Sequence, residues 1–258
     1  MAISNLEVYQ FSCLDDNFGY LVHDPVAGVT ATIDTPEVGP INQALADKSW
    51  NLTHIFNTHH HPDHAGGNLE LKEQWGCEIV GAKCDSARIP GIDLQLGDGD
   101  TFEFGEHAVQ VFETPGHTVG HIVFHFVNDD IAFVGDTLFS MGCGRLFEGD
   151  AIQMWSSLEK ILQWPESTLL YCAHEYTQGN GHFALTVEPQ NADLQARVKQ
   201  VDELRAAGKW TVPTTLKLEK ATNPFLRPAS ADLQQTIGKV GAPLAEVMGE
   251  TRRLKDNA

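Results

Sequence analysis

Seven consecutive residues, 58–64, hold four histidines and one aspartate in the order Thr-His-His-His-Pro-Asp-His. Imidazole and carboxylate groups are ligands of divalent ions such as zinc, manganese and iron. Residues i and i+2 of an extended chain point the same way, so His59 and His61 can bind one ion together. Pro62 favours a turn, after which Asp63 and His64 can face a neighbouring position. The residue types and their spacing therefore predict a metal site.

The residues around this motif are those of a strand that runs into a helix. A largely apolar run at residues 52–56 leads into the motif, and Gly66 and Gly67 separate it from a helix-like stretch at residues 68–75. The alternative is a solvated polar turn that happens to be rich in histidine. Such a turn would not need a strand-to-helix junction, and this context favours the metal site.

Three more candidate ligands follow predicted strands elsewhere in the chain. His117 lies in a Thr-Pro-Gly-His-Thr loop, Asp136 follows the apolar run at residues 131–134, and His174 follows the run at residues 168–172. Loops at one edge of a sheet are common places for a functional site. These residues are therefore candidates for the same site as the histidine motif.

Other reactive side chains fit a structural role better. His60 lies between two candidate ligands and should point away from them by alternation. His121 and His125 lie on a predicted strand, where a core or strand-surface position is expected. Cys143 and Cys172 are close to the candidate ligands in sequence, but small apolar core cysteines are common and no cysteine nucleophile is expected.

The first two thirds of the chain are rich in predicted strands, and the remainder is mainly helical. Strands are predicted at residues 6–14, 20–23, 29–33, 52–57, 78–81, 101–104, 108–112, 121–127, 131–134 and 168–172. Helices are predicted at residues 41–47, 68–75, 152–162, 192–207, 230–240 and 243–248. We therefore predict two domains, residues 1–174 and residues 175–258.

Charge and composition narrow the class of protein. Residues 1–174 have 6 Lys and Arg against 25 Asp and Glu, a balance of −19, while residues 175–258 have 11 against 10, a balance of +1. An acidic body argues against nucleic acid as a partner. No run is long and apolar enough for a membrane span, and no signal peptide is recognised, so a cytoplasmic protein is expected. Five scattered cysteines suit reduced thiols.

Taken together, these motifs resemble the metallo-β-lactamase superfamily and, within it, the glyoxalase II (hydroxyacylglutathione hydrolase) family. The superfamily pattern is residues 58–64 with His117, Gly135-Asp136 and His174. The narrower resemblance runs through residues 135–139, 142–145, 172–177, 187–189 and 223–225. It implies an α/β fold, an αββα sandwich followed by a small α-helical C-terminal domain that contributes to the substrate site.

The resemblance also implies a binuclear metal centre. In it, His59, His61 and His117 hold one ion, Asp63, His64 and His174 hold the second, and Asp136 bridges the two. The cofactors would be two divalent ions per chain, with zinc favoured and iron or manganese as alternatives. Asp63 and Asp136 would serve catalysis through a metal-bound hydroxide.

The activity implied is hydrolysis of S-D-lactoylglutathione to glutathione and D-lactate, the second step of methylglyoxal detoxification, by a monomer. The residues implied in binding the glutathione part are Arg145, Phe147, Tyr176, Arg252 and Lys255. Arg and Lys side chains suit the two carboxylates of glutathione. Arg145 stands where other members have lysine, and Phe147 where some have a tyrosine that donates a hydrogen bond.

Three alternatives stay open. A mononuclear iron persulfide dioxygenase would need only His59, His117 and Asp136, which leaves the other candidate ligands without a purpose. A β-lactamase or lactonase would share the metal site but not the substrate. A non-catalytic metal-binding scaffold is disfavoured by the complete ligand set.

Overall fold

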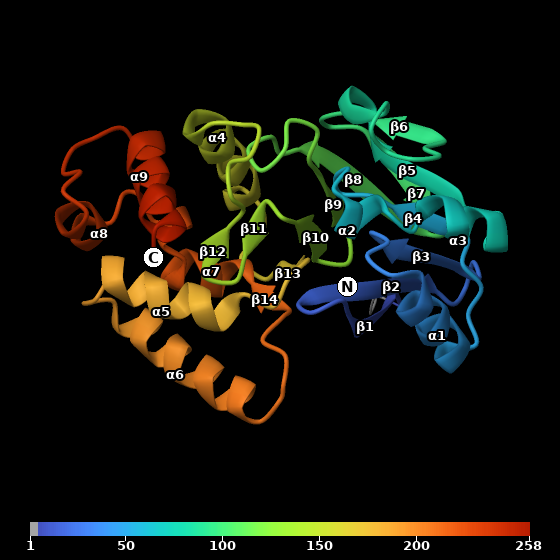
Figure 1. Ribbon diagram of the computed structural model, residues 1–258, viewed down its shortest axis with the longest axis horizontal. Coiled ribbons are helices and arrows are strands. Elements are labelled where there is room, and N and C mark those ends of the chain that lie inside the picture. The colour runs from blue at the N-terminus through green and yellow to red at the C-terminus, as the bar shows by residue number, and fades with distance from the viewer. Residues whose placement is uncertain (1–4) are drawn as a thin grey trace. The chain divides into compact units, whose positions relative to one another are not determined.

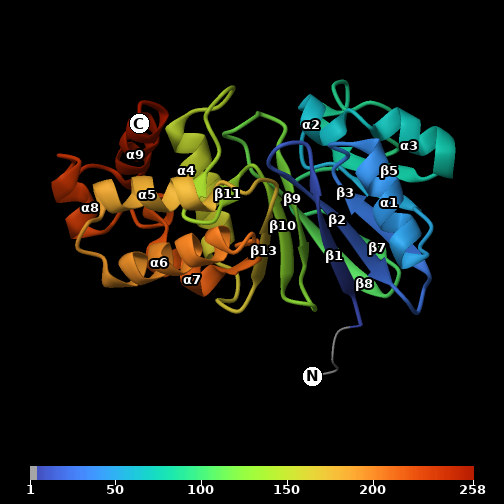
Figure 2. The same ribbon diagram turned by 60° about the horizontal axis from the view of Figure 1, so that its bottom comes forward.

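The structure, a computed structural model, describes residues 5–258, which form two compact units (Figures 1 and 2). The first unit contains the chain up to Glu113 together with Gly120–Gly135. The second contains Thr114–Val119 and Asp136–Ala258. This division does not test the predicted domain boundary after residue 174, which stays a prediction. Each unit is described by itself.

The first sheet of the first unit has six strands. Its members in spatial order are β1 (Glu7–Cys13), β2 (Asn17–Asp24), β3 (Val29–Ile33), β4 (His54–Phe56), β5 (Glu78–Ala82) and β6 (Leu94–Leu96). The first three strands pair antiparallel, whereas β3 to β6 pair parallel. Parallel neighbours need crossover connections. Helices α1 (Val38–Lys48) and α3 (Asn68–Trp75) lie in two of these crossovers and cover one face of the sheet (Figure 2).

The second sheet of this unit contains four antiparallel strands, β7 (Thr101–Phe104), β8 (His107–Glu113), β9 (Ile122–Phe126) and β10 (Ile131–Gly135). Aromatic rings fill the space between the two sheets. The ring of Phe56 on β4 lies 5.2 Å from those of Phe102 and Phe124, and Tyr20 on β2 lies 5.6 Å from Phe133. Large buried rings in tilted and edge-to-face contacts make a rigid core. The loops at the strand ends therefore start from fixed positions.

The second unit is mainly helical. Its helices are α4 (Ala151–Leu162), α5 (Thr177–Val187), α6 (Ala192–Ala206), α7 (Leu216–Thr222), α8 (Ala231–Thr236) and α9 (Leu244–Asp256). Its short strands form two antiparallel pairs, β11 (Leu138–Phe139) with β12 (Gly142–Cys143) and β13 (Leu169–Cys172) with β14 (Thr214–Thr215). Helices α5 and α6 contribute to a buried cluster made of Met141, Ala184, Leu194, Val198 and Val201.

Local signals in the sequence fix several helix starts. Asp150 accepts hydrogen bonds from the backbone N–H groups of Ile152 and Gln153, and the Gln153 side chain accepts from the Asp150 N–H, which completes a capping box for α4. The predicted N-cap Ser230 accepts from the Leu233 N–H at the start of α8. The predicted strands at residues 29–33 and 101–104 and the predicted helix at residues 68–75 agree with β3, β7 and α3.

In the second unit, the helices predicted at residues 152–162 and 192–207 agree with α4 and α6 to within one residue, but the other helix predictions were wrong. Helix α5 was not predicted because its sequence contains two glycines, which weaken helix formation, and it is held by packing against α6. Helix α7 was also missed. Helix α9 was predicted to end at residue 248 but continues to Asp256, because its charged second half still buries Thr251 and Arg252. Helix α8 ends earlier than predicted, shortly before Gly238, which has φ 70°.

Candidate active site

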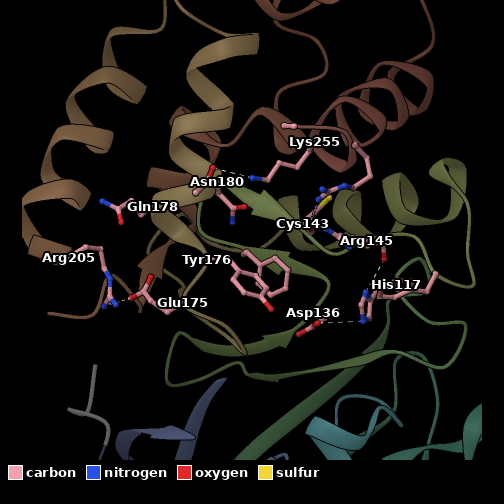
Figure 3. A pocket seen from close by; sticks show the side chains of 15 residues that line it. His117, Asp136, Cys143, Arg145, Glu175, Tyr176, Gln178, Asn180, Arg205 and Lys255 are labelled. Carbon is pink, nitrogen blue, oxygen red and sulfur yellow. Dashed lines mark hydrogen bonds and ion pairs between the residues drawn. The ribbon is translucent and has the colours of Figure 1, made fainter. Parts of the chain in front are cut away.

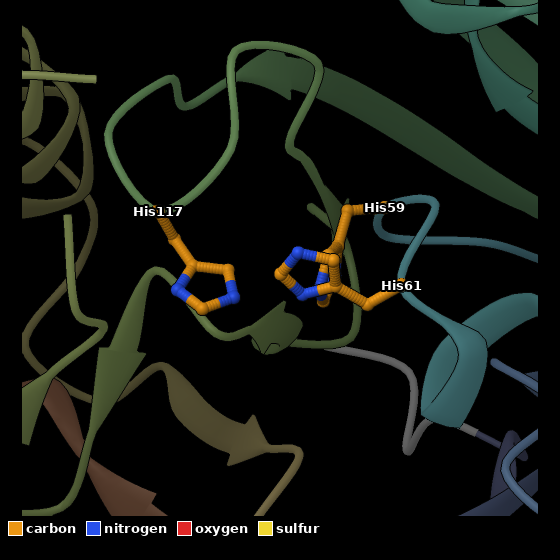
Figure 4. Close-up of side chains that lie close together, drawn as sticks. All are labelled: His59, His61 and His117. Carbon is orange, nitrogen blue, oxygen red and sulfur yellow. The ribbon is translucent and has the colours of Figure 1, made fainter. Parts of the chain in front are cut away.

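His59 and His61 lie in the loop between β4 and α2 (Pro62–Ala65) in the first unit. His59 Nε2 lies 2.9 Å from His61 Nδ1 (Figure 4). His59 is fully buried. Two ring nitrogens this close together can bind the same ion, as the alternation of side chains predicted.

Asp63 and His64 form a second pair of donor groups in the same unit. Both belong to α2, and Asp63 Oδ2 lies 3.4 Å from His64 Nε2. Asn17 Nδ2 on β2 donates to Asp63 Oδ2 at 3.3 Å, which positions the carboxylate. The histidine motif therefore presents two pairs of donors, His59 with His61 and Asp63 with His64.

The prediction from sequence missed Asp34, which holds this loop in place. Its carboxylate accepts hydrogen bonds from Thr58 N at 2.7 Å, from Thr58 Oγ1 at 2.8 Å and from His64 Nδ1 at 2.8 Å. Because the neutral His64 ring that donates its Nδ1–H to Asp34 has its lone pair on Nε2, that nitrogen is the one that can bind an ion. A carboxylate behind a ligating histidine is the usual support in metal sites. The available signal was an aspartate at the end of β3, whose neighbour β4 leads into the motif.

In the second unit, His117, Asp136 and His174 lie together. Asp136 Oδ2 lies 3.4 Å from His117 Nε2, and Asp136 Oδ1 lies 3.5 Å from His174 Nε2. All three side chains are buried. A carboxylate with one oxygen near each of two imidazoles can contribute ligand atoms to a metal site.

Backbone contacts fix this arrangement. His117 Nδ1 lies 2.9 Å from the Arg145 carbonyl oxygen, which can only accept, so Nδ1 carries a proton and Nε2 faces Asp136. The His174 ring stacks on Tyr176 with 4.8 Å between ring centroids. A Cβ at Gly144 would lie 2.1 Å from the Asp136 carbonyl oxygen and 3.1 Å from the His117 ring, so this position must be glycine.

The remaining histidines of this region take structural positions in the first unit. His60 Nδ1 lies 3.1 Å from Asp85 Oδ2, and His60 Nε2 lies 3.2 Å from Arg88 Nη1. His121 is buried and stacks against His59 with 4.9 Å between ring centroids. His125 is also buried, and burial lowers its pKa to about 4. His121 and His125 are thus core side chains, one of the two roles expected for them.

A cavity of about 690 Å³ lies in the second unit (Figure 3). It reaches from His117 and Asp136 to the five residues predicted to bind substrate, which are Arg145, Phe147, Tyr176, Arg252 and Lys255. Its volume is typical of a site for a small organic molecule. The structure thus brings together all the predicted substrate residues and two of the predicted metal ligands.

The cationic side chains of the cavity differ in how freely they can bind a ligand. Arg145 has a side chain that is 65% exposed, with Nε 3.6 Å from Asp256 Oδ1. Arg252 is buried, donates from Nη1 to the Cys143 carbonyl at 2.8 Å and forms an ion pair with Asp256 at 2.9 Å. Lys255 Nζ donates to the Gly179 carbonyl at 3.1 Å. Burial, followed by the charges of Arg252 and Arg145, lowers the pKa of Lys255.

The aromatic side chains line the part of the cavity near the candidate ligands. Phe147 is 62% exposed, and its ring lies 5.2 Å from the His117 ring. Because Phe147 has no hydroxyl group, it cannot donate the hydrogen bond that a tyrosine would donate at this position. Tyr176 is 40% exposed and contacts Phe139 and His174. Both rings can pack against a ligand that reaches Asp136.

The cavity also contains polar residues that were not predicted from the sequence. They are Glu175, Gln178, Asn180 and Arg205. Glu175 follows His174 directly, which was the one available signal. The others lie on α5 and α6, and α5 was itself not predicted.

The cysteines near the site do not suit a nucleophile. Cys143 and Cys172 are buried, and burial raises their pKa values to about 11 and about 12. Both therefore stay protonated near neutral pH, whereas the thiolate is the reactive form. Within residues 5–258, every helix is too short or too polar to cross a bilayer.

Comparison with known proteins covers nearly the whole chain. Residues 24–174 match the family model described as metallo-beta-lactamase superfamily, and residues 175–258 match the model described as hydroxyacylglutathione hydrolase C-terminus. Proteins named hydroxyacylglutathione hydrolase from Rhizobium etli and Methylococcus capsulatus are 54% and 52% identical to this chain. The alignments cover 98% and 97% of this chain and 98% of each relative.

Solved structures support the same fold at lower identity. ETHE1 from Myxococcus xanthus has a TM-score of 0.65 and 24% identity, and the match covers 98% of this chain and 100% of that one. TTHA1623 in a di-iron-bound form has a TM-score of 0.60 and 23% identity, covering 85% and 100%. The predicted metallo-β-lactamase fold with a helical C-terminal part is confirmed. The fold and the histidine and aspartate groups together indicate that the chain binds divalent metal.

Proposed function

The chain belongs to the hydroxyacylglutathione hydrolase family of metallo-β-lactamase-fold hydrolases, and we propose that it cleaves S-D-lactoylglutathione and related 2-hydroxyacyl glutathione thioesters. The products are glutathione and the free 2-hydroxy acid, D-lactate in the first case. This reaction is the second step of methylglyoxal detoxification. A monomer in the cytoplasm fits this role, and all five cysteines are free thiols suited to a reducing compartment.

The observation that carries the proposal is the way the donor groups separate into two sets. In the first unit, His59 is paired with His61, and Asp63 is paired with His64. In the second unit, Asp136 turns one oxygen to His117 and the other to His174. We assign His59, His61 and His117 to one ion, Asp63, His64 and His174 to the other, and Asp136 to both.

The donor set fits two divalent ions. Five imidazoles and two carboxylates suit zinc, which we favour, and also iron or manganese. Two ions held there would acidify a water molecule toward neutral pH and draw charge from the thioester carbonyl. Asp136 and Asp63 serve catalysis by holding that centre. No side chain has to act as the nucleophile, in agreement with the protonated state of Cys143 and Cys172.

The cavity of the second unit supplies the substrate site. Arg145, Arg252 and Lys255 place three cations at its wall, and Asp256 is paired with two of them. A glutathione carboxylate gains charge-assisted hydrogen bonds there. Tyr176 and Phe147 pack against the thioester, and Phe147 does so without donating a hydrogen bond.

The test is hydrolysis of S-D-lactoylglutathione by the purified protein, followed by loss of the thioester absorbance, with metal content measured on the same sample. We expect rapid turnover and about two ions per chain. One iron per chain together with oxygen uptake on a glutathione persulfide would instead indicate a dioxygenase. Absence of turnover in fully metallated protein would refute the substrate assignment.

Asp136→Asn tests the proposed role of Asp136 as a ligand of both ions. The amide cannot offer two anionic oxygens, so metal occupancy and turnover should both collapse. Asp193→Asn is the control, because Asp193 is an exposed residue in the first turn of α6 and does not line the cavity. Wild-type turnover by the Asp136 variant would contradict the bridging role.

A further inference from the structure

The cavity of the second unit has a second charged end that the glutathione-binding residues above do not use. Glu175, Gln178 and Arg205 line it. In Figure 3, Arg205 and Glu175 lie on one side of Tyr176, and Arg145 and Lys255 lie on the other. The two ends come from different elements, since Arg205 is near the end of α6 and Lys255 near the end of α9.

The second end is held rigidly but keeps hydrogen-bonding capacity. The Glu175 carboxylate accepts from Thr211 N at 2.9 Å and from Thr211 Oγ1 at 2.6 Å. Arg205 Nη1 contacts Glu175 Oε2 at 3.4 Å and donates to the Lys209 carbonyl at 3.0 Å. Among residues 5–258, nothing accepts a hydrogen bond from Arg205 Nε or Nη2. An arginine has five N–H donors, so most of them are available to a ligand.

Gln178 adds an acceptor beside this pair. Its Nε2 donates to Asp202 Oδ1 at 2.8 Å, which fixes the amide and leaves Oε1 as an acceptor. The side chains of Glu175 and Arg205 are 8% and 31% exposed. This end of the cavity thus offers fixed acceptors beside a partly open guanidinium, with no net charge from the Arg205–Glu175 pair.

The two ends therefore suit different chemical groups. The three cations Arg145, Arg252 and Lys255 favour a ligand group that carries a carboxylate alone. An arginine beside a glutamate favours a zwitterion. The carboxylate of the zwitterion can pair with the guanidinium, and its ammonium can donate to the oxygens of Glu175 and Gln178. Glutathione has both groups, a glycine carboxylate at one end and the α-amino acid of the γ-glutamyl residue at the other, with the sulfur between them.

We propose that Arg205, with Glu175 and Gln178, forms a subsite for the γ-glutamyl α-amino acid group of the substrate. Arg205 binds the α-carboxylate, and the oxygens of Glu175 and Gln178 accept from the α-ammonium. The glycine carboxylate then lies at Arg145, and the thioester faces His117 and Asp136. This assignment rests on the proposed thioesterase function and adds the direction in which the tripeptide lies.

The test compares two thioesters, S-D-lactoylglutathione and S-D-lactoyl-N-acetylcysteinylglycine, in which an acetyl group replaces the γ-glutamyl residue and keeps the cysteine nitrogen acylated. For the wild type, we expect KM to be about tenfold higher for the truncated thioester. Arg205→Met should raise KM for the glutathione thioester by about the same factor, with kcat nearly unchanged. The same variant should leave KM for the truncated thioester within about twofold of wild type. Arg205→Lys should recover part of the loss.

The control is Arg253→Met, since Arg253 is an exposed arginine paired with Glu250 that does not line the cavity. It should change neither KM. An equal rise of KM for both thioesters in Arg205→Met would show that Arg205 acts through the fold, and no change would show that it does not bind; either result overturns the subsite. If Arg205→Met does not fold, the wild type alone decides, because equal KM values for the two thioesters also overturn it.

Failure of the proposed function would give a different pattern. If the metallated wild type cleaves neither thioester, calorimetric titration with glutathione and with N-acetylcysteinylglycine still tests the subsite. Tighter binding of glutathione that is lost in Arg205→Met supports the subsite without the reaction. Equal binding of the two peptides refutes it.

Discussion

At the scale of single residues, the spacing within the histidine motif was informative because it depends only on local chain geometry. His59, His61, Asp63 and His64 are paired in the structure as side-chain alternation and the turn at Pro62 suggested. Asp34 could not be found in this way, since its contact with His64 depends on the parallel pairing of β3 with β4. Arg205 was missed for a similar reason, because nothing local places α6 beside a cavity.

Asp34 gives a prediction about metal affinity. In Asp34→Asn, the amide must turn its nitrogen toward either His64 Nδ1 or Thr58, so one of the present hydrogen bonds is lost. Loss of such support typically weakens metal binding by about 10- to 100-fold. Competition with a chromophoric chelator measures this without a turnover assay. Asp193→Asn is the control, because Asp193 is an exposed residue in the first turn of α6, away from the histidine motif. Equal chelator competition by both variants would exclude the supporting role.

Arg145 and Arg252 should respond differently to the same substitution. Arg145→Met removes a mostly exposed cation, so KM should rise while the melting temperature stays unchanged. Arg252→Met also removes hydrogen bonds to the Cys143 carbonyl and to Asp256, so it should lower the melting temperature as well as raise KM. Buried charge-assisted bonds contribute about 1.5–3 kcal/mol. Equal melting temperatures for the two variants would contradict this distinction.

At the scale of elements, the β11–β12 hairpin is held by the buried carboxylate of Glu219. Glu219 Oε2 accepts from Met141 N at 2.7 Å and from Asn223 Nδ2 at 3.0 Å. Its Oε1 accepts from the hydroxyl groups of Ser140 and Thr214. The hairpin carries Phe139 and Cys143 into the cavity wall, so Glu219 positions the cavity without touching it.

Two substitutions of Glu219 should therefore differ strongly. Glu219→Gln keeps an acceptor for the two N–H donors, and its amide can donate to hydroxyls that reverse their direction. Glu219→Leu leaves the Met141 N–H buried without its partner, at a cost of about 1–3 kcal/mol, and removes one of the three acceptors of Asn223 Nδ2. Urea unfolding should show a small loss of stability for the first variant and a large one for the second. Similar losses would mean that the network does not hold the hairpin.

The same carboxyl group predicts a pH dependence. Burial raises the pKa of Glu219 above its ordinary value of 4.5, so the folded chain binds this proton more tightly than the unfolded chain does. The contribution of Glu219 to the free energy of unfolding therefore falls as pH rises from about 4.5 through the raised pKa. Glu219→Gln does not titrate, and its stability relative to wild type should increase over that range. A constant difference between the two proteins would contradict the shift.

The elements themselves were predictable where the hydrophobic pattern was regular. Strands β3 and β7 and helices α3, α4 and α6 lie within one residue of their predicted bounds, and α4 has a regular apolar face that includes Met154, Leu158 and Ile161. Helix α5 has two glycines, and the second half of α9 is rich in charge, so neither sequence signals a helix without its packing partners. The cavity wall depends on both helices, which explains why its residues were inferred from family resemblance rather than from local pattern.

At the scale of the whole molecule, two electrostatic effects on an anionic substrate oppose each other. The net charge of −18 repels it over a long range, whereas the cations around Arg145 attract it at contact. The Debye length is about 30 Å at 0.01 M salt and about 10 Å at 0.1 M, so added salt removes the long-range repulsion first. Contact pairs in a partly buried cavity are screened less.

We therefore expect kcat/KM for S-D-lactoylglutathione to rise between about 0.01 and 0.1 M sodium chloride, and to fall again toward about 1 M as the contact pairs are screened. An uncharged lactoyl thioester of N-acetylcysteamine should show neither change, because it experiences neither force. Arg145→Met should keep the rise and reduce the fall, since it removes a contact charge and leaves the acidic body intact. A monotonic fall from the lowest salt concentration would show that the cavity, and not the net charge, governs encounter with the substrate.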